Sequence, residues 1–265
     1  MSSASKAEDL APDVMVDVVN LTIGWDDAVL QENATFQVAR GDVFVILGGS
    51  GCGKSTLLRH LVGLEVPLAG EISIAGLGRP RLDVGRPPYG VMFQGGALFG
   101  SMTVGENVAL PIDQWTALPH DAVTAIVRAK LRLVGLSAAE DKFPSEISGG
   151  MKKRAAIARA LALEPALVFL DEPSAGLDPV SAVELDDLIV TLNEGLGVTM
   201  VIVTHELESI FKIGKTCIML DRDTRSIIAR GDPRVLRDTA EDPRVAGFFH
   251  RAPRSAEQRL TREMP

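Results

Sequence analysis

The chain has 265 residues, of which 46% are hydrophobic, and it carries a formal net charge of −8 with an isoelectric point of about 5.1. This length allows one large domain or two small ones, and the hydrophobic content is ample for a buried core. The acidic balance excludes an overall basic field that would attract nucleic acid, so we expect no nucleic-acid partner.

The few cysteines and histidines indicate neither a disulfide framework nor a zinc site. Cys52 and Cys217 are the only cysteines, and the four histidines lack the spacing of zinc ligands. The first 13 residues lack the apolar segment of a signal peptide, and no stretch reads as a membrane span. We therefore predict a protein of the reducing cytoplasm that would work at a membrane only through a partner.

The N-terminal part predicts a disordered segment followed by an antiparallel pair of strands. Residues 1–12 are expected to be disordered, and residues 14–22 and 34–38 read as the two strands. Trp25 lies in the predicted turn between them. It is either an ordinary packed tryptophan or an aromatic that stacks on a nucleotide base, and the sequence leaves both readings open.

The next segment predicts a phosphate-binding loop. An apolar strand at residues 43–47 leads into GGSGCGKST, which matches G-x-x-x-x-G-K-[ST], and a helix is predicted from residue 57. The residues of this loop are Gly48, Gly49, Ser50, Gly51, Cys52, Gly53, Lys54, Ser55 and Thr56. Glycines let successive N–H groups turn toward an anion, and the helix dipole adds positive potential at the same point. Lys54 can then reach the β- and γ-phosphates of ATP, and the Ser55 hydroxyl can ligate Mg²⁺.

The middle of the chain changes from strands to helices. Short strands are predicted at residues 71–75 and 91–93, and the second of these ends at Gln94. Helices are predicted at residues 104–109 and 121–134. We interpret this block as a helical insert in an α/β domain. The alternative is a set of further crossover helices of one continuous sheet.

A second candidate anion site begins the next helix. Ser148, Gly149 and Gly150 precede a helix predicted at residues 151–163, and small residues at a helix N-terminus expose N–H groups to an anion. The basic run KKR at residues 152–154 we interpret as a solvated helix face.

Two later strands end in candidate catalytic residues. Residues 167–170 are apolar on both faces, as in a central parallel strand, and they end at Asp171 and Glu172. Because ligands bind at the carboxyl edge of such a sheet, Asp171 is placed to hold Mg²⁺ and Glu172 to act as a general base. His205 ends the β-branched strand at residues 198–204, so we favour a functional role for it over that of a core histidine.

The order of these motifs resembles the ATP-binding subunit of ABC transporters. The matching segments are GGSGCGKST, Gln94, ISGGM at 147–151, VFLDEP at 168–173, SAGLD at 174–178 and His205. The resemblance implies an α/β P-loop NTPase core with an antiparallel β-subdomain and a helical subdomain at about residues 95–163. It also implies an ATP-binding domain over residues 13–240 and a partly loose C-terminal extension over residues 241–265.

The family's roles transfer to matching positions. Lys54 and Ser55 would hold phosphate and Mg²⁺, and Gln94 would contact Mg²⁺ and water and signal to the membrane partner. Asp171 would ligate Mg²⁺ through water, Glu172 would be the catalytic base, and His205 would contact the γ-phosphate. Ser148, Gly149 and Gly150 would close on ATP bound by a second copy, and Asp178 would lie in a dimer-contact loop, so the resemblance implies a homodimer.

One branch of the family matches further. Met151 stands where the broad family usually has Gln, and ISGGMKKRAAIARALALEP, FQGGALF, ENVALPI and EDPRVAGFF resemble ATPases of Mla-type transporters. These work with MCE-domain proteins and move phospholipids, and EDPRVAGFF resembles the tail with which they reach onto their dimer partner. The resemblance thus implies transport-coupled ATP hydrolysis at the cytoplasmic face of the inner membrane, with an integral membrane permease and with MCE-domain and small regulatory subunits as further partners.

Three alternatives remain open at this stage. They are an importer ATPase for a polar solute, a soluble ABC-type ATPase acting on DNA or ribosomes, and a binding module that does not hydrolyse ATP. The chain has neither a long coiled-coil insert nor a second ATPase unit, as the DNA and ribosome types would need. The presence of Glu172 and His205 argues against the binding module.

Overall fold

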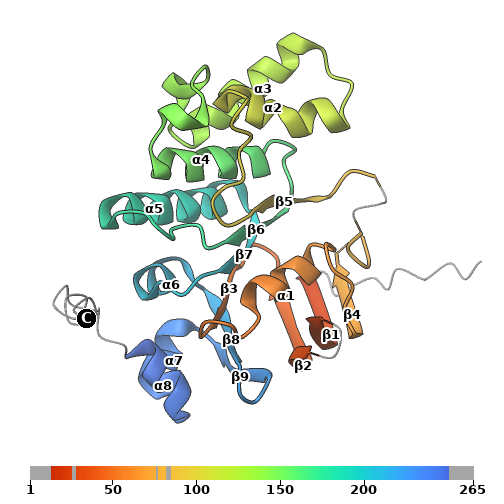
Figure 1. The fold of residues 1–265 in the computed structure, drawn as a ribbon, viewed down its shortest axis with the longest axis vertical. Helices are drawn as coiled ribbons and strands as arrows, with labels where there is room; N and C mark the ends of the chain where they lie inside the picture. The colour runs from red at the N-terminus through yellow and green to blue at the C-terminus, as the bar shows by residue number, and fades with distance from the viewer. Residues whose placement is uncertain (1–12, 26–27, 76, 82–84, 251–265) are drawn as a thin grey trace, which may run out of the picture.

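The computed structural model describes residues 13–25, 28–75, 77–81 and 85–250 (Figure 1). The predictions for residues 1–12 and for the tail after residue 250 lie outside these ranges. The strands are β1 (Val14–Trp25), β2 (Ala28–Ala39), β3 (Val43–Gly48), β4 (Ala69–Ile74), β5 (Tyr89–Met92), β6 (Leu167–Asp171), β7 (Thr199–Val203), β8 (Thr216–Asp221) and β9 (Ser226–Gly231). The helices are α1 (Lys54–Leu61), α2 (Val104–Trp115), α3 (His120–Leu133), α4 (Gly149–Ala160), α5 (Pro179–Leu196), α6 (Leu207–Ile213), α7 (Pro233–Thr239) and α8 (Pro243–Phe249), with 3₁₀ turns at Ser137–Ala139 and Pro144–Glu146.

The central sheet has six strands in the order β5-β6-β7-β3-β8-β9, and all are parallel to their neighbours except β9. Strands β3, β6 and β7 are buried along their whole length, because helices cover one face of the sheet and α1 with strands β1, β2 and β4 covers the other. The three predicted strands are confirmed, and the prediction of a central parallel strand at residues 167–170 is correct. This arrangement brings the ends of β3, β6 and β7 to one edge.

A separate three-stranded antiparallel sheet, in the order β2-β1-β4, lies beside α1 (Figure 1). The predicted pair of strands is confirmed, but each strand is longer than its alternating pattern indicated. Gly24 and Trp25 belong to β1 and pair with Val29 and Ala28, so the turn is shorter than predicted. The two sheets share a core in which the rings of Phe36 and Phe44 stack with centroids 5.5 Å apart.

Helices α2, α3 and α4 gather at one end of the molecule, away from α7 and α8 (Figure 1). Helix α2 begins with a reciprocal cap: Thr103 Oγ1 accepts from the Glu106 N–H and Glu106 Oε2 accepts from the Thr103 N–H. The predicted stop at residue 109 is wrong. Helix α2 continues through Pro111 because Ile112, the next residue, is buried in the core that α2 shares with α3 and α4.

The last two helices cover the far side of the central sheet. Val245, Phe248 and Phe249 of α8 are buried against β3, β8 and α6 of the same chain. Arg244 adds an ion pair to Asp221 at 2.8 Å. Helix α8 therefore packs on its own chain. A contact of residues 241–249 with a second copy remains a prediction.

A close contact between β5 and α4 provides a test of the fold. A Cβ atom on Gly90 would lie 2.1 Å from the Ala160 carbonyl oxygen, so we expect Gly90→Ala to lower the free energy of unfolding by about 1–3 kcal/mol. In the matched control Gly195→Ala, the new Cβ meets nothing within 4 Å in helix α5, and alanine should be neutral or slightly stabilising. Urea unfolding of both variants measures the difference, and equal midpoints would contradict the contact.

Candidate functional site

The candidate site lies at the carboxyl edge of the central sheet. Strands β3, β6 and β7 end there at Gly48, Asp171 and Val203. The phosphate loop, Glu172 and His205 follow these three strand ends directly. A cleft of about 1370 Å³ opens at this point. It is lined by most of the phosphate loop together with Gln94, Glu172 and His205.

The phosphate loop has the backbone that its glycines predicted. Gly48, Gly51 and Gly53 have φ angles of 147°, 77° and 98°, a region that other residues rarely adopt. Gly53 is the N-cap of α1 and has no side chain to occupy the N–H groups of the first turn, so these remain available to an anion. The Lys54 ammonium lies over the loop and donates to the carbonyl oxygens of Gly48 at 3.0 Å and Gly49 at 3.1 Å.

Cys52 fills the space beneath the loop. Its side chain is 1% exposed, and a Cβ atom on Gly48 would lie 2.5 Å from the Cys52 sulfur. Burial raises the pKa of the Cys52 thiol, with the Lys54 charge acting in the opposite direction. This cysteine is therefore a neutral filler, and Gly48 has no room for a side chain.

Ser55 and Asp171 come together across the cleft floor. The Ser55 hydroxyl donates to Asp171 Oδ1 at 3.1 Å, joining the start of α1 to the end of β6. Burial raises the pKa of Asp171, the hydrogen bond from Ser55 lowers it, and the neighbouring Glu172 charge raises it. A hydroxyl and a carboxylate oxygen at this spacing are hard donors of the kind that Mg²⁺ prefers.

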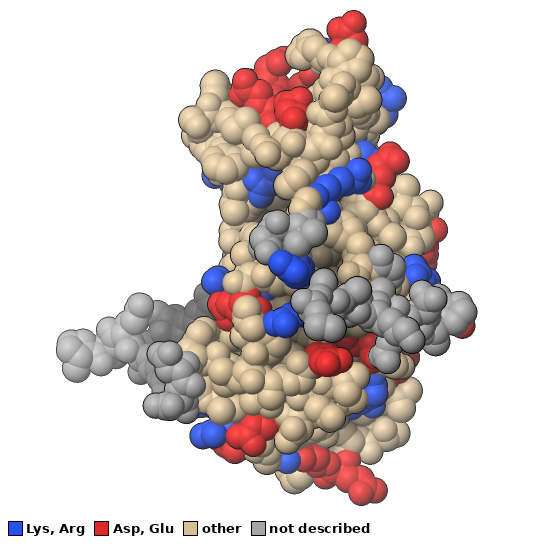
Figure 2. Space-filling model, turned by 90° about the vertical axis from the view of Figure 1, so that its right-hand side faces the viewer, with Lys and Arg blue, Asp and Glu red and all other residues tan. Residues whose placement is uncertain are grey.

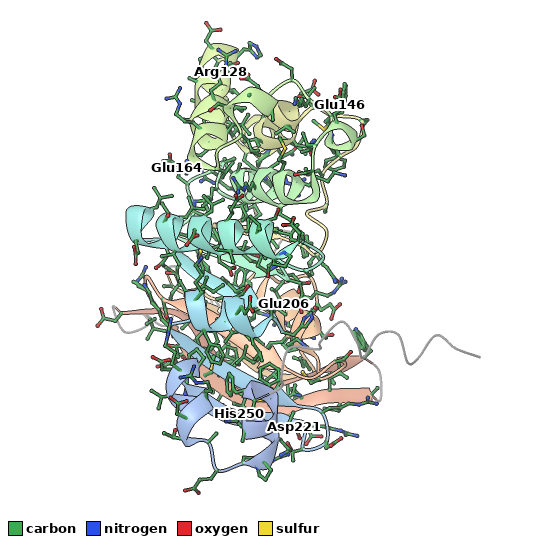
Figure 3. All side chains as sticks on the ribbon, turned by 90° about the vertical axis from the view of Figure 1, so that its left-hand side faces the viewer. Arg128, Glu146, Glu164, Glu206, Asp221 and His250 are labelled. Carbon is green, nitrogen blue, oxygen red and sulfur yellow. The ribbon has the colours of Figure 1, made fainter. Side chains whose placement is uncertain are left out.

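Glu172 and His205 form the second pair. His205 Nδ1 lies 2.8 Å from Glu172 Oε1, whereas Glu172 Oε2 is buried without a hydrogen-bond partner among the described residues. Glu172 is only 7% exposed, and its φ of 48° places its backbone in the left-handed region. Glu206 is the residue before α6 and follows His205; it lies at mid-height of the molecule in Figure 3. The arrangement leaves one carboxylate oxygen of Glu172 free to accept a proton.

Two predicted groups do not line the cleft. Trp25 is 53% exposed at the end of β1, so base stacking by this residue remains a prediction. Ser148, Gly149 and Gly150 begin α4 as predicted, and the Ser148 hydroxyl accepts from the Met151 N–H at 3.2 Å. Ser148 and Gly149 are exposed and do not line the cleft of their own chain, although Gly149 lies next to Leu177 at its border.

Sequence reasoning missed several residues of the cleft. Ser174, Asp186 and Ser209 are buried in its wall, and Phe248 reaches it from α8. The interpretation of residues 152–154 as a solvated face is wrong for Lys153, which is 6% exposed. Helical periodicity could have placed Lys153 on the face of α4 that carries Ala156 and Ile157, both buried.

Comparison with known proteins gives one family. Residues 31–175 match the family model described as ABC transporter. The intermembrane phospholipid transport system ATP-binding protein MlaF of Escherichia coli (strain K12) is 40% identical over 240 residues, covering 89% of this chain and 88% of that protein. The probable ribonucleotide transport ATP-binding protein mkl of Mycobacterium tuberculosis (strain ATCC 25618 / H37Rv) is 40% identical over 242 residues, covering 89% of this chain and 67% of that protein.

A solved structure gives the same fold. The dimeric structure of a post-hydrolysis state of an ATP-binding cassette, bound to ADP and Pi, superimposes with a TM-score of 0.72 at 29% identity. The match covers 82% of this chain and 98% of that one. The predicted α/β fold, with its antiparallel sheet and helical part, is confirmed.

The buried carboxylate of Asp171 gives a test by pH. Burial raises the pKa of Asp171 above its value of about 4 in the unfolded chain. At a pH above the folded-state pKa, the ionised Asp171 therefore lowers the free energy of unfolding, and this effect is absent below pH 4, where the group is protonated in both states. We expect Asp171→Asn, measured without nucleotide, to raise the midpoint of thermal unfolding by a few degrees at pH 7, and the gain should shrink toward pH 4. Calorimetry over this range measures it. The exposed control Asp223→Asn should change little, and an unchanged or lower midpoint for Asp171→Asn at pH 7 would contradict the assignment.

Proposed function

The chain belongs to the ABC transporter family of ATPases, and on that premise we propose that it dimerises around two ATP molecules and drives phospholipid transport through a membrane permease. The observation that carries the catalytic part is the meeting of the Ser55–Asp171 and Glu172–His205 pairs beside the phosphate loop. The cargo part is supported by the similarity to MlaF over most of both chains.

The nucleotide phosphates would bind at the phosphate loop. Backbone N–H groups at the start of α1 and the Lys54 ammonium supply positive potential there. Mg²⁺ would be held by Ser55 and Asp171, with Gln94, which also lines the cleft, as a further oxygen donor. The bound ion would neutralise charge on the phosphates during transfer.

Glu172 would act as the general base. In hydrolysis, the water oxygen bonds to the γ-phosphorus, the bond from that phosphorus to the ADP oxygen breaks, and the water proton passes to a carboxylate. Glu172 Oε2 has the free lone pairs for this proton, while His205 holds Oε1 and orients the group. His205 is exposed on its cleft side and can also reach the γ-phosphate.

A second copy would complete the site. Ser148 and Gly149 at the start of α4 are exposed and Gly150 is half-buried, and none of the three lines the cleft of its own chain. A two-fold axis would place them on the nucleotide bound by the partner. Asp178 caps α5 by accepting from the N–H groups of Val180 and Ser181, which fixes the loop expected at the dimer contact.

The permease would bind an apolar groove beside Gln94. The groove has a volume of about 560 Å³, and its walls include Tyr89, Phe93, Phe99 and Trp115. Phe99 is 53% exposed, and such exposed apolar surface marks an interaction site. Within the described ranges no helix is long and apolar enough to cross a membrane, so membrane transport would require such a partner. Charged side chains are scattered over the face shown in Figure 2 rather than gathered in one basic patch, which does not favour a nucleic-acid partner.

A second cargo has a specific observation in its favour. The mkl relative is named for ribonucleotide transport, and its identity to this chain equals that of MlaF. We favour phospholipid because the match spans 88% of MlaF but only 67% of mkl. The phospholipid assignment includes MCE-domain and small regulatory subunits and a peripheral position at the cytoplasmic face of the inner membrane.

The assignment of the base predicts the behaviour of Glu172→Gln. This variant should bind ATP–Mg²⁺ and accumulate as a closed dimer, while its turnover falls by about 10²–10⁴-fold because no carboxylate accepts the proton. Size-exclusion chromatography with ATP and a phosphate-release assay measure the two effects. The exposed control Glu194→Gln on α5 should keep wild-type turnover, and a monomeric, fully active Glu172→Gln would refute the assignment.

The cargo is tested by isolating the native complex. The tagged chain, purified with its membrane partners, should carry a permease, an MCE-domain protein and stoichiometric phospholipid by mass spectrometry. A soluble solute-binding protein without enriched lipid would overturn the cargo and leave the ATPase assignment intact.

The groove is tested by the variant Phe99→Asp. It should lose the permease while its nucleotide affinity stays unchanged, because Phe99 lines the groove and not the cleft.

A further inference from the structure

Lys153 has an unusual place for a lysine. It lies five residues after the Ser148 cap of α4, and its side chain is 6% exposed. Its ammonium donates to the backbone carbonyl oxygen of Glu172 at 3.0 Å. A buried ammonium costs free energy unless it is paired, and here its partner is the peptide of the proposed catalytic base.

The Glu172 peptide needs such a partner. Glu172 is one of few non-glycine residues with a positive φ, at 48°, a conformation that costs a non-glycine residue about 1 kcal/mol or more. Its N–H donates to the Val203 carbonyl oxygen at 2.8 Å, which fixes one side of the residue to β7. Its carbonyl is fixed by Lys153 and, at 3.3 Å, by the Ala175 N–H. The direction of the Glu172 side chain depends on these contacts.

The hydrogen bond of Lys153 goes to a main-chain carbonyl and not to a carboxylate. The ammonium bonds the Glu172 main chain, while the Glu172 side chain bonds His205. Burial lowers the pKa of Lys153, and the charges of Glu172 and Asp171 raise it, so these two acids favour the charged form. Lys153 therefore orients Glu172 and does not occupy its Oε2 oxygen.

We propose that Lys153 is a positioning residue for hydrolysis: from the helix that begins at Ser148, it holds the Glu172 peptide in the left-handed conformation that aims the carboxylate into the cleft. This inference rests on the proposed function, in which Glu172 is the base. It adds that one helix contacts the nucleotide of the partner through its N-terminus and the base of its own chain through Lys153.

The test compares three lysine variants by steady-state kinetics. Lys153→Met keeps the length of the side chain and removes the donor. It should lower kcat by about 10- to 100-fold, because the base is misplaced, while KM for ATP changes less than about twofold. Lys153→Gln keeps an uncharged N–H donor and should recover part of kcat. The control Lys152→Met removes the same charge from a half-buried neighbour in α4 and should match the wild type.

The outcomes distinguish a Lys153 that positions Glu172 from one that only stabilises the fold. A wild-type kcat for Lys153→Met overturns the proposal. So does a joint loss of kcat, nucleotide affinity and thermal midpoint that Lys153→Gln does not relieve, since that result describes a structural lysine. A crystal structure of Lys153→Met gives a readout free of activity: the proposal expects Glu172 to leave its positive φ and Oε1 to leave its 2.8 Å contact with His205, and an unchanged Glu172 refutes it.

Failure of the proposed function looks different. In that case Glu172→Gln would hydrolyse ATP as fast as the wild type, whatever the lysine variants do. The structure of Lys153→Met would still decide whether the lysine holds the Glu172 peptide.

Discussion

The hydrogen-bond register of the parallel sheet is the constraint on which the site depends. Strand β7 lies between β6 and β3, and the register pairs Asp171 with Val203 and Val203 with Ile46. The three strands therefore end at nearly the same height, and the residues after them must meet. A slip by one residue would turn every buried side chain of these strands to the other face and separate Ser55 from Asp171.

Two strained backbones stand at this edge, and each has a use. The positive φ angles of the phosphate loop fall on glycines, which adopt them without steric cost, so the loop turns its N–H groups inward. The positive φ of Glu172 falls on a residue that does carry a Cβ atom, so the surrounding contacts must hold it. Val203 of β7 and Lys153 of α4 bond the Glu172 main chain, and His205, in the loop after β7, bonds its carboxylate. Strain is thus stored where the direction of one carboxylate matters.

The sequence predicted the parts of the site that depend on local pattern. Strand-loop-helix order identified the phosphate loop, and an apolar strand before two acids identified Asp171 and Glu172, because each signal lies within a few adjacent residues. The burial of Lys153 and the position of Phe248 depend on partners far along the chain. The Lys153 ammonium meets residue 172, and Phe248 packs against α6 and β8. Helical periodicity indicates at most that position 153 is buried, and neither local pattern identifies the partner. The start of helix α2 was predicted correctly and its end was not, for the same reason, since burial of Ile112 outweighs the local effect of Pro111.

Helix α4 contacts parts of the molecule that lie far apart in the sequence. Its N-terminus is exposed at Ser148, its middle holds the Glu172 carbonyl through Lys153, and near its end Arg159 donates to the carbonyl oxygens of Gly96 and Ala97, both at 2.8 Å. Those two carbonyls belong to the loop that follows Gln94, at the border of the cleft and the apolar groove. A straight helix of this length cannot bend to satisfy one contact without moving the others, because its rise is fixed at about 1.5 Å per residue. A shift of α4 imposed at the groove would therefore displace the loop after Gln94 and the peptide of the base together, and a partner nucleotide at Ser148 would oppose or favour that same shift. In the proposed dimer, this one helix would contact the nucleotide, the peptide of the base and the loop beside the groove, so their coupling would need no separate relay.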